Sequence, residues 1–122
     1  MAFDKGDIIW VDFKNRHPFR LKHPAVVWED TDDESDFLGI MLTHSGPTMR
    51  FDNILMNEQR FRKGYEFAFS NTHFVNQVFI KFRDWGPFHI SGKLTLKGIE
   101  FIESRLTNRV QISFLEYISD YA

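Results

Sequence analysis

The residues best suited to chemistry are imidazole and hydroxyl groups at the ends of short apolar runs. His23 opens one such run, and Thr43, His44 and Ser45 close another. Short apolar runs predict buried strands, so these side chains are expected where a strand reaches solvent, a common place for functional groups. Two imidazoles that face one phosphate, one neutral and one protonated, form an acid–base pair that needs no metal.

Each of these residues also has a purely structural interpretation. The His23 imidazole can cap a backbone carbonyl at a strand start, and the Thr43 hydroxyl can hydrogen-bond a turn. Neighbouring strand residues point to opposite faces, so His44 shares a site with Thr43 only if the strand has ended. His17 and His73 are expected at the surface. The histidine spacing matches no metal motif, and neither a metal nor another cofactor is predicted.

A basic loop between the first two predicted strands supplies candidate anion-binding groups. Arg16, Arg20 and Lys22 lie in this loop, close in sequence to His23. Exposed cations most often serve solubility. Their grouping beside a candidate phosphate site favours phosphate binding over that ordinary role.

Apolar runs separated by turn residues predict a mainly β protein whose small, strongly bent antiparallel sheet is an SH3-like barrel. The predicted strands cover residues 7–13, 25–28, 37–42, 53–56, 66–69 and 72–82. Apolar residues on both faces of 7–13 indicate a strand that is buried on one side and partly covered on the other. The acidic stretch 30–36 is expected to be a solvated hairpin loop, because neighbouring carboxylates repel and no calcium-loop pattern is present.

The last part of the chain changes to a helical period. Thr95 is the predicted N-cap, and apolar residues recur after it at spacings of three and four: Leu96, Ile99, Ile102 and Leu106. A second apolar stripe, from Val110 to Tyr121, predicts a second helix or a kinked continuation. We therefore expect a domain over residues 1–106 that includes the first helix. Residues 107–122 are expected to be a helical extension that packs on the barrel or on a second subunit.

Length and composition restrict the class of protein. A chain of 122 residues suits one domain. It has no cysteine, which suits a reducing cytoplasm. No apolar run approaches the roughly 20 residues that span a bilayer, and the N-terminus lacks a signal-peptide layout.

The net charge of −2 hides an uneven distribution of charge. Five of the 17 acidic residues fall between 30 and 36, which leaves 12 acids against 15 Lys and Arg elsewhere, a balance of +3. A mildly basic surface can hold a short single strand of nucleic acid. It falls short of the strongly basic composition of a duplex-binding domain.

Three segments resemble the MazF/PemK family of toxin endoribonucleases. The first reads Gly-Asp-Ile-Ile-Trp-Val-Asp-Phe over Gly6–Phe13, the second reads Pro-Ala-Val-Val after His23, and the third ends at Thr43. Family members carry Gly-Asp-(apolar)-(apolar)-Trp-Val-(Asp)-Phe, then Arg-Pro-Ala-Val-Val, then a strand that ends in Thr-Ser or Thr-Thr. The similarity runs to about Leu106, and His23 stands where the family has arginine.

This resemblance implies a barrel of the MazF/PemK/CcdB type and a toxin of a type II toxin–antitoxin system. It implies a cytoplasmic homodimer that cleaves single-stranded RNA without a metal and is silenced by an antitoxin protein. The catalytic positions that carry over are His23 and Thr43, to which His44 is added as a neighbouring imidazole. Gln77 falls where relatives carry an Asp-Gln or Glu-Gln pair near the site, although it can equally face solvent. The predicted substrate-binding residues are Arg16, Arg20, Lys22, Ser45 and Gln77.

Because His23 stands where the family has arginine, the sequence does not decide whether the protein cleaves RNA. A histidine replaces arginine as a phosphate-facing cation only when it is protonated, yet an imidazole is the better proton shuttle. One alternative is a disabled MazF-like fold that acts as an RNA- or protein-binding module. Another is a CcdB-like toxin that inhibits gyrase, and the Pro-Ala-Val-Val segment and Thr43 favour the ribonuclease over it.

Overall fold

A computed structural model describes residues 3–12, 22–30, 36–44, 46, 52–65, 71–82 and 89–113. The strands are β1 (Asp7–Asp12), β2 (Lys22–Asp30), β3 (Asp36–Thr43), β4 (Asn53–Met56), β5 (Thr72–Val75), β6 (Phe79–Phe82), β7 (Ile90–Lys93) and β8 (Ile112–Ser113). A short 3-10 helix, η1 (Glu58–Arg60), follows β4, and one α-helix, α1 (Leu96–Arg105), follows β7.

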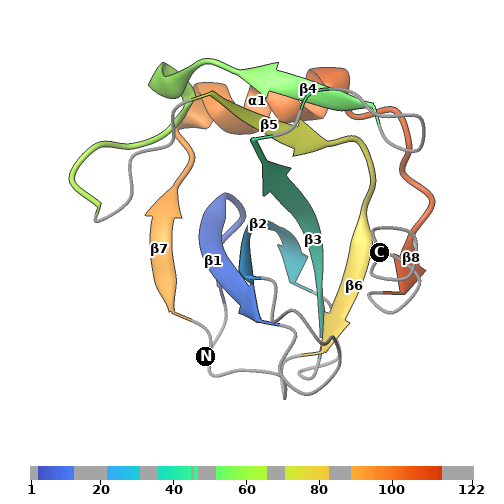
Figure 1. Cartoon of the computed structure of the whole chain (residues 1–122). Helices are drawn as coiled ribbons and strands as arrows, with labels where there is room; N and C mark the ends of the chain where they lie inside the picture. The colour runs from blue at the N-terminus through green and yellow to red at the C-terminus, as the bar shows by residue number, and fades with distance from the viewer. Residues whose placement is uncertain are drawn as a thin grey trace.

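The strands form one bent sheet in the order β4–β5–β3–β2–β1–β7 (Figure 1). Strand β6 pairs with β3 and, in parallel, with β8, whereas every other ladder is antiparallel. In the described residues the end strands β4 and β7 do not pair with each other, and a single bridge joins Phe61 to Leu94 beyond them. The described part of the protein is therefore mainly β with a sheet that is not closed, and the predicted SH3-like barrel is not confirmed.

Strand β1 is buried on both of its faces. Ile8 belongs to the main core with Val26, whereas its neighbour Ile9 packs in a second cluster with Val27 and Phe37. Alternate residues of a strand point to opposite faces, so these two clusters cover both faces of β1. This confirms the prediction that the strand is covered on both sides. The antiparallel ladder that joins Asp30 to Phe37 also confirms that the acidic stretch connects two strands of a hairpin.

Two predictions of secondary structure are wrong. The strand predicted over 72–82 is divided into β5 and β6, because Asn76 and Gln77 turn their buried amides to the C-terminal segment. The helix predicted after residue 106 does not form over residues 107–113, where β8 lies along β6. There the Ile112 N–H donates to the carbonyl of Val78 (3.2 Å), so it has no helical partner. The strand predicted over 66–69 and the chain after residue 113 lie outside the described residues.

Helix α1 begins where the sequence predicts. The Thr95 hydroxyl accepts the Gly98 N–H (3.0 Å), which is the bond expected of an N-cap. The buried face of the helix joins the main core through Ile102, while Leu96 is 69% exposed. In Figure 1 the helix lies behind β4 and β5. No helix in the described part of the chain has the length and apolar character to cross a membrane.

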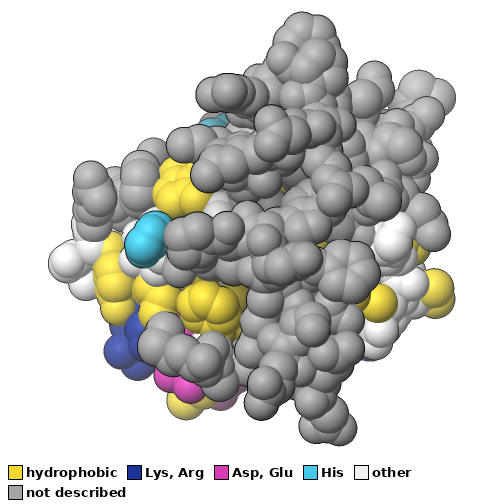
Figure 2. Space-filling view, turned by 90° about the horizontal axis from the view of Figure 1, so that it is seen from below, with side chains coloured by type: hydrophobic (Ala, Val, Ile, Leu, Met, Phe, Trp, Pro, Cys, Tyr) yellow, Lys and Arg dark blue, Asp and Glu magenta, His cyan; other side chains and the backbone are white. Residues whose placement is uncertain are grey.

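The end of the molecule that is lower in Figure 1 carries hydrophobic side chains on its surface (Figure 2). A few Lys or Arg side chains lie next to Asp or Glu side chains at one edge of this face. The described charges visible there are therefore mixed, and they form no basic stripe for a phosphate backbone.

We predict that Gly98→Ala destabilises the fold, although alanine in a helix is normally more stable than glycine by about 1 kcal/mol. A Cβ at Gly98 overlaps the carbonyl oxygen of Arg60, and that oxygen is already held by the N–H and the hydroxyl of Thr95 (2.9 and 3.2 Å). We expect a loss of about 1–3 kcal/mol in the free energy of unfolding, measured by urea denaturation.

Gly46→Ala is the matched control, because a Cβ there has no atom within 4 Å. A stabilised Gly98→Ala protein contradicts the close approach of α1 to η1.

Candidate functional site

The end of β3 is the place where three strands meet. Residues 36–39 of β3 pair with β6, whereas Leu42 and Thr43 pair with β5. On its other side β3 pairs with β2. Strand β3 thus changes its partner from β6 to β5 along its length. The break at Asn76–Val78 makes this change possible, because it divides residues 72–82 into two strands that pair with different parts of β3. The candidate residues of the third predicted strand therefore lie at a junction of β2, β3 and β5.

Thr43 is the last residue of β3 and is 8% exposed. Its cross-strand partner is His73 on β5, and the preceding pair is Leu42 with Phe74. Leu42 and Phe74 both belong to the main core, so Thr43 and His73 share the opposite face of the sheet. Thr43 thus keeps a nearly buried hydroxyl beside an imidazole.

His44 is exposed and lies on a bend directly after β3. The strand has therefore ended before His44. The rule that neighbouring strand residues point to opposite faces does not apply to it, so His44 can lie on the same side as Thr43. Of the residues expected nearby, Ser45, Arg16 and Arg20 lie outside the described residues.

His23 and Lys22 are described as backbone positions at the start of β2. His23 pairs with Val11 of β1. The ladder between β2 and β3 pairs Ala25 with Met41, and the same register extended by two residues sets His23 opposite Thr43. Extended in this way, the register would place side by side the two positions that the resemblance in sequence suggests as catalytic.

The side chain of Gln77 is buried and fully engaged within the protein. Its amide nitrogen donates to the carbonyls of Val78 (2.9 Å) and Val110 (2.6 Å), and its oxygen accepts from the Asn108 amide (2.6 Å). Both of its N–H donors are therefore used, so reading a base edge requires these bonds to open. Its predicted contact with substrate stays a prediction.

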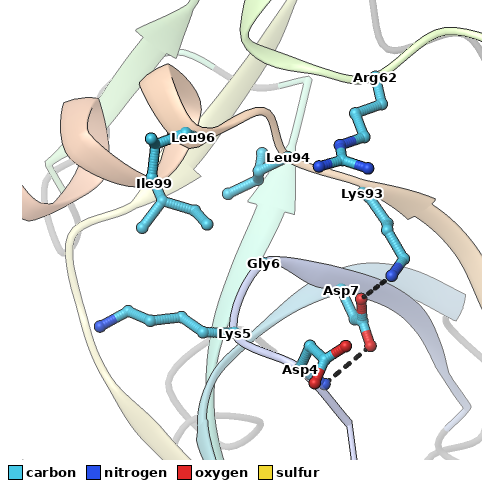
Figure 3. Close-up of a pocket in the computed structure, with 9 residues that line it drawn as sticks. All are labelled: Asp4, Lys5, Gly6, Asp7, Arg62, Lys93, Leu94, Leu96 and Ile99. Carbon is cyan, nitrogen blue, oxygen red and sulfur yellow. Dashed lines mark hydrogen bonds and ion pairs between the residues drawn. The ribbon is translucent and has the colours of Figure 1, made fainter.

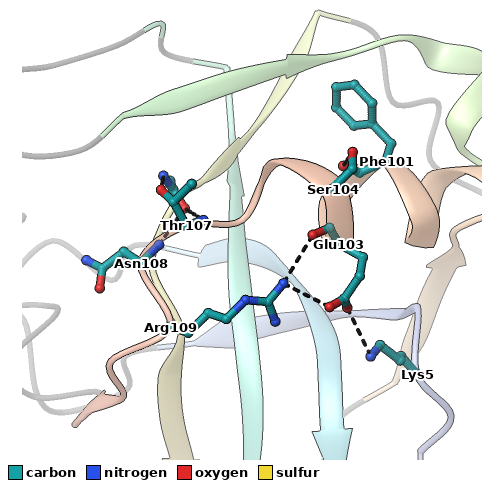
Figure 4. A network of polar contacts seen from close by, with 8 residues as sticks. Lys5, Phe101, Glu103, Ser104, Thr107, Asn108 and Arg109 are labelled. Carbon is teal, nitrogen blue, oxygen red and sulfur yellow. Dashed lines mark hydrogen bonds and ion pairs between the residues drawn. The ribbon is translucent and has the colours of Figure 1, made fainter.

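Asn76 completes this attachment of the C-terminal segment. Its side-chain oxygen accepts the N–H groups of Thr107 (3.0 Å) and Asn108 (3.3 Å), and its nitrogen donates to the Thr107 hydroxyl (2.7 Å). Figure 4 shows Thr107 and Asn108 on the segment that follows α1. The same figure shows Glu103 between Lys5 and Arg109, a pair of half-exposed contacts that contribute little to stability.

His73 is the residue of this junction that sequence reasoning missed. It is half-buried rather than at the surface, and it also faces Leu55 of β4 across the ladder. Its Nδ1 is buried and makes no hydrogen bond. Alternation around Phe74 places His73 away from the core, but nothing in the sequence pairs it with Thr43.

A pocket of about 210 Å³ lies elsewhere, between β1, β7 and the start of α1 (Figure 3). Asp7 is buried at its base, where it accepts the Asp4 N–H (2.9 Å) and pairs with the ammonium of Lys93 (3.3 Å). Arg62 lines the same wall and is exposed. None of the described residues that line this pocket is a predicted site residue.

In the described part of the chain, no three His, Asp or Glu residues are grouped so as to hold an ion. No family model matches the chain, and comparisons with curated proteins and with solved structures give no match either.

Proposed function

We propose that this protein is a metal-independent endoribonuclease of the MazF/PemK type, the toxin of a type II toxin–antitoxin system. One observation carries the proposal: the β2–β3 ladder ends with Ala25 opposite Met41, and its register, extended by two residues, would set His23 opposite Thr43 at the end of a buried strand. These are the two positions at which the sequence resembles the catalytic residues of that family. The substrate is single-stranded RNA, whose 2′-hydroxyl supplies the nucleophile.

The reaction needs a base, an acid and donors to the phosphorane. A neutral imidazole takes the proton of the 2′-hydroxyl while the O2′–P bond forms and the P–O5′ bond breaks. The leaving 5′-oxygen takes a proton from a second, protonated imidazole. We assign these two imidazoles to His23 and His44, and the Thr43 hydroxyl donates to a non-bridging oxygen. Arg16, Arg20, Lys22 and Ser45 hold the adjoining phosphates.

The second candidate is a disabled ribonuclease that binds RNA or protein without cleavage. The specific observation in its favour is His23 itself, because a permanently charged guanidinium is absent from the family position. A CcdB-like gyrase inhibitor shares the fold that the resemblance implies. It does not require the His23–Thr43 juxtaposition, so we rank it third.

We predict that the purified protein cleaves single-stranded RNA in excess EDTA. His23→Ala loses roughly 100-fold or more in kcat, since acid–base catalysis contributes about 10²–10⁴. Thr43→Ala loses roughly 100-fold or more, because removal of a donor to the transition state costs about 10²–10³. His23→Arg keeps or raises the activity. His89→Ala is the control, because His89 is exposed and directly precedes β7, whose strand partner is β1 and not β3 or β5. Cleavage products resolved on a denaturing gel measure the rates.

The same assay separates the alternatives. An inactive wild-type protein with an active His23→Arg variant identifies a disabled ribonuclease. Inactivity of both overturns the proposed function, and the likeness in sequence then extends to the fold alone.

We further propose a homodimer that an antitoxin protein silences in the cytoplasm. The sequence carries an apolar stripe from Val110 to Tyr121, of which Val110 is 73% exposed, and apolar side chains left at a surface favour association. Light scattering is expected to give about twice the chain mass of 14.5 kDa. A monomer mass at micromolar concentration contradicts the dimer.

A further inference from the structure

His73 contains an unexplained polar atom. Its Nδ1 is buried and has no hydrogen-bond partner. Buried polar atoms in proteins are nearly all paired, and the exceptions call for a reason such as a role in binding or catalysis. The second ring nitrogen, Nε2, is not among the buried unpaired atoms, and the His73 side chain makes no hydrogen bond within the described residues. Nε2 is therefore the nitrogen that a ligand can reach.

The lack of a hydrogen-bond acceptor at Nδ1 determines which ring nitrogen of His73 carries the proton when the imidazole is neutral. A metal-bound or catalytic histidine is usually oriented by a carboxylate or carbonyl that accepts one N–H. Here no such group holds a proton on Nδ1, and a buried N–H without an acceptor is rarer in proteins than a buried acceptor without a donor. The neutral tautomer of His73 therefore carries its proton on Nε2. It presents an N–H donor at the accessible edge of the ring.

The position of this donor matches the proposed reaction. Thr43 and His73 are direct cross-strand partners on one face, and side chains so placed have Cβ atoms about 4.5–5.5 Å apart. Leu55, 55% exposed, flanks His73 on the other side and leaves the edge toward Thr43 as the polar one. The side chains of Thr43 and His73 are thus direct neighbours on one face, close enough for both to reach one phosphate group.

We propose that His73 is a further catalytic residue, whose Nε2–H donates to a non-bridging oxygen of the scissile phosphate. This inference rests on the proposed ribonuclease function and adds to it a role that the sequence did not indicate. Together with Thr43, His73 supplies from β5 part of the phosphate stabilisation that arginine at position 23 would have given. A donor aimed at charge that develops in the transition state acts mainly on kcat.

The test compares variants that keep or remove the donor. His73→Phe retains a ring of similar shape without an N–H, and His73→Gln retains an N–H donor. We expect His73→Phe to lower kcat by about 10²–10³-fold, as for the removal of an oxyanion donor. His73→Gln should recover at least part of this loss. The control is His89→Phe, and urea unfolding of each variant shows that it is folded.

A phosphorothioate substrate distinguishes catalysis from a structural role. Sulfur accepts hydrogen bonds poorly, so one non-bridging diastereomer should be cleaved more slowly by the wild type. This stereospecific slowing should shrink in His73→Phe. A loss of kcat with an unchanged thio effect overturns the proposal, as does a His73→Phe variant within threefold of wild type. Wild-type protein that cleaves no RNA overturns the ribonuclease function itself, a result distinct from an active wild type that tolerates His73→Phe.

Discussion

The exchange of partners along β3 is the constraint on which the rest of the structure depends. A single strand pairs with β6 over its first half and with β5 over its last two residues. This is possible only because the chain breaks between β5 and β6, at Asn76–Val78. The side chains of Asn76 and Gln77 are buried there and satisfied by the segment that follows α1, so the break costs no unpaired amide. The C-terminal segment thus stabilises the corner that sets the position of Thr43.

The same corner explains why the candidate site is formed by residues from distant parts of the sequence. β2 contributes the position of His23, β3 contributes Thr43, and β5 contributes His73. Leu42 and Phe74 form the cross-strand pair that faces the core. Because side chains alternate along a strand, the next pair, Thr43 and His73, must face away from the core. A hydroxyl and an imidazole are thereby held together by the backbone ladder and need no hydrogen bond between them.

Local patterns predicted the elements, and long-range contacts decided the exceptions. The alternation in β1, the short apolar runs of β2 and β3, the hairpin that joins these two strands and the Thr95 cap are visible in the sequence because each depends on neighbouring residues. The division of 72–82 depends on bonds from Asn76 and Gln77 to residues more than thirty positions away. The apolar stripe after Val110 has helical spacing, yet pairing with β6 takes residues 112–113 into a strand. His73 escaped notice for the same reason, since only the register reveals its neighbour.

The register of β3 and β5 is therefore the claim to measure most directly. The chain has no cysteine, so a Thr43→Cys/His73→Cys double variant introduces one unambiguous pair. Direct cross-strand partners lie within the range of about 4.4–6.8 Å between Cα atoms that a disulfide spans. We expect rapid, nearly complete intramolecular crosslinking of this variant under mild oxidation, seen by mass spectrometry. We expect little crosslinking in Thr43→Cys/Thr72→Cys, whose side chains face opposite sides. Crosslinking of the second pair in preference to the first would contradict the register and, with it, the site.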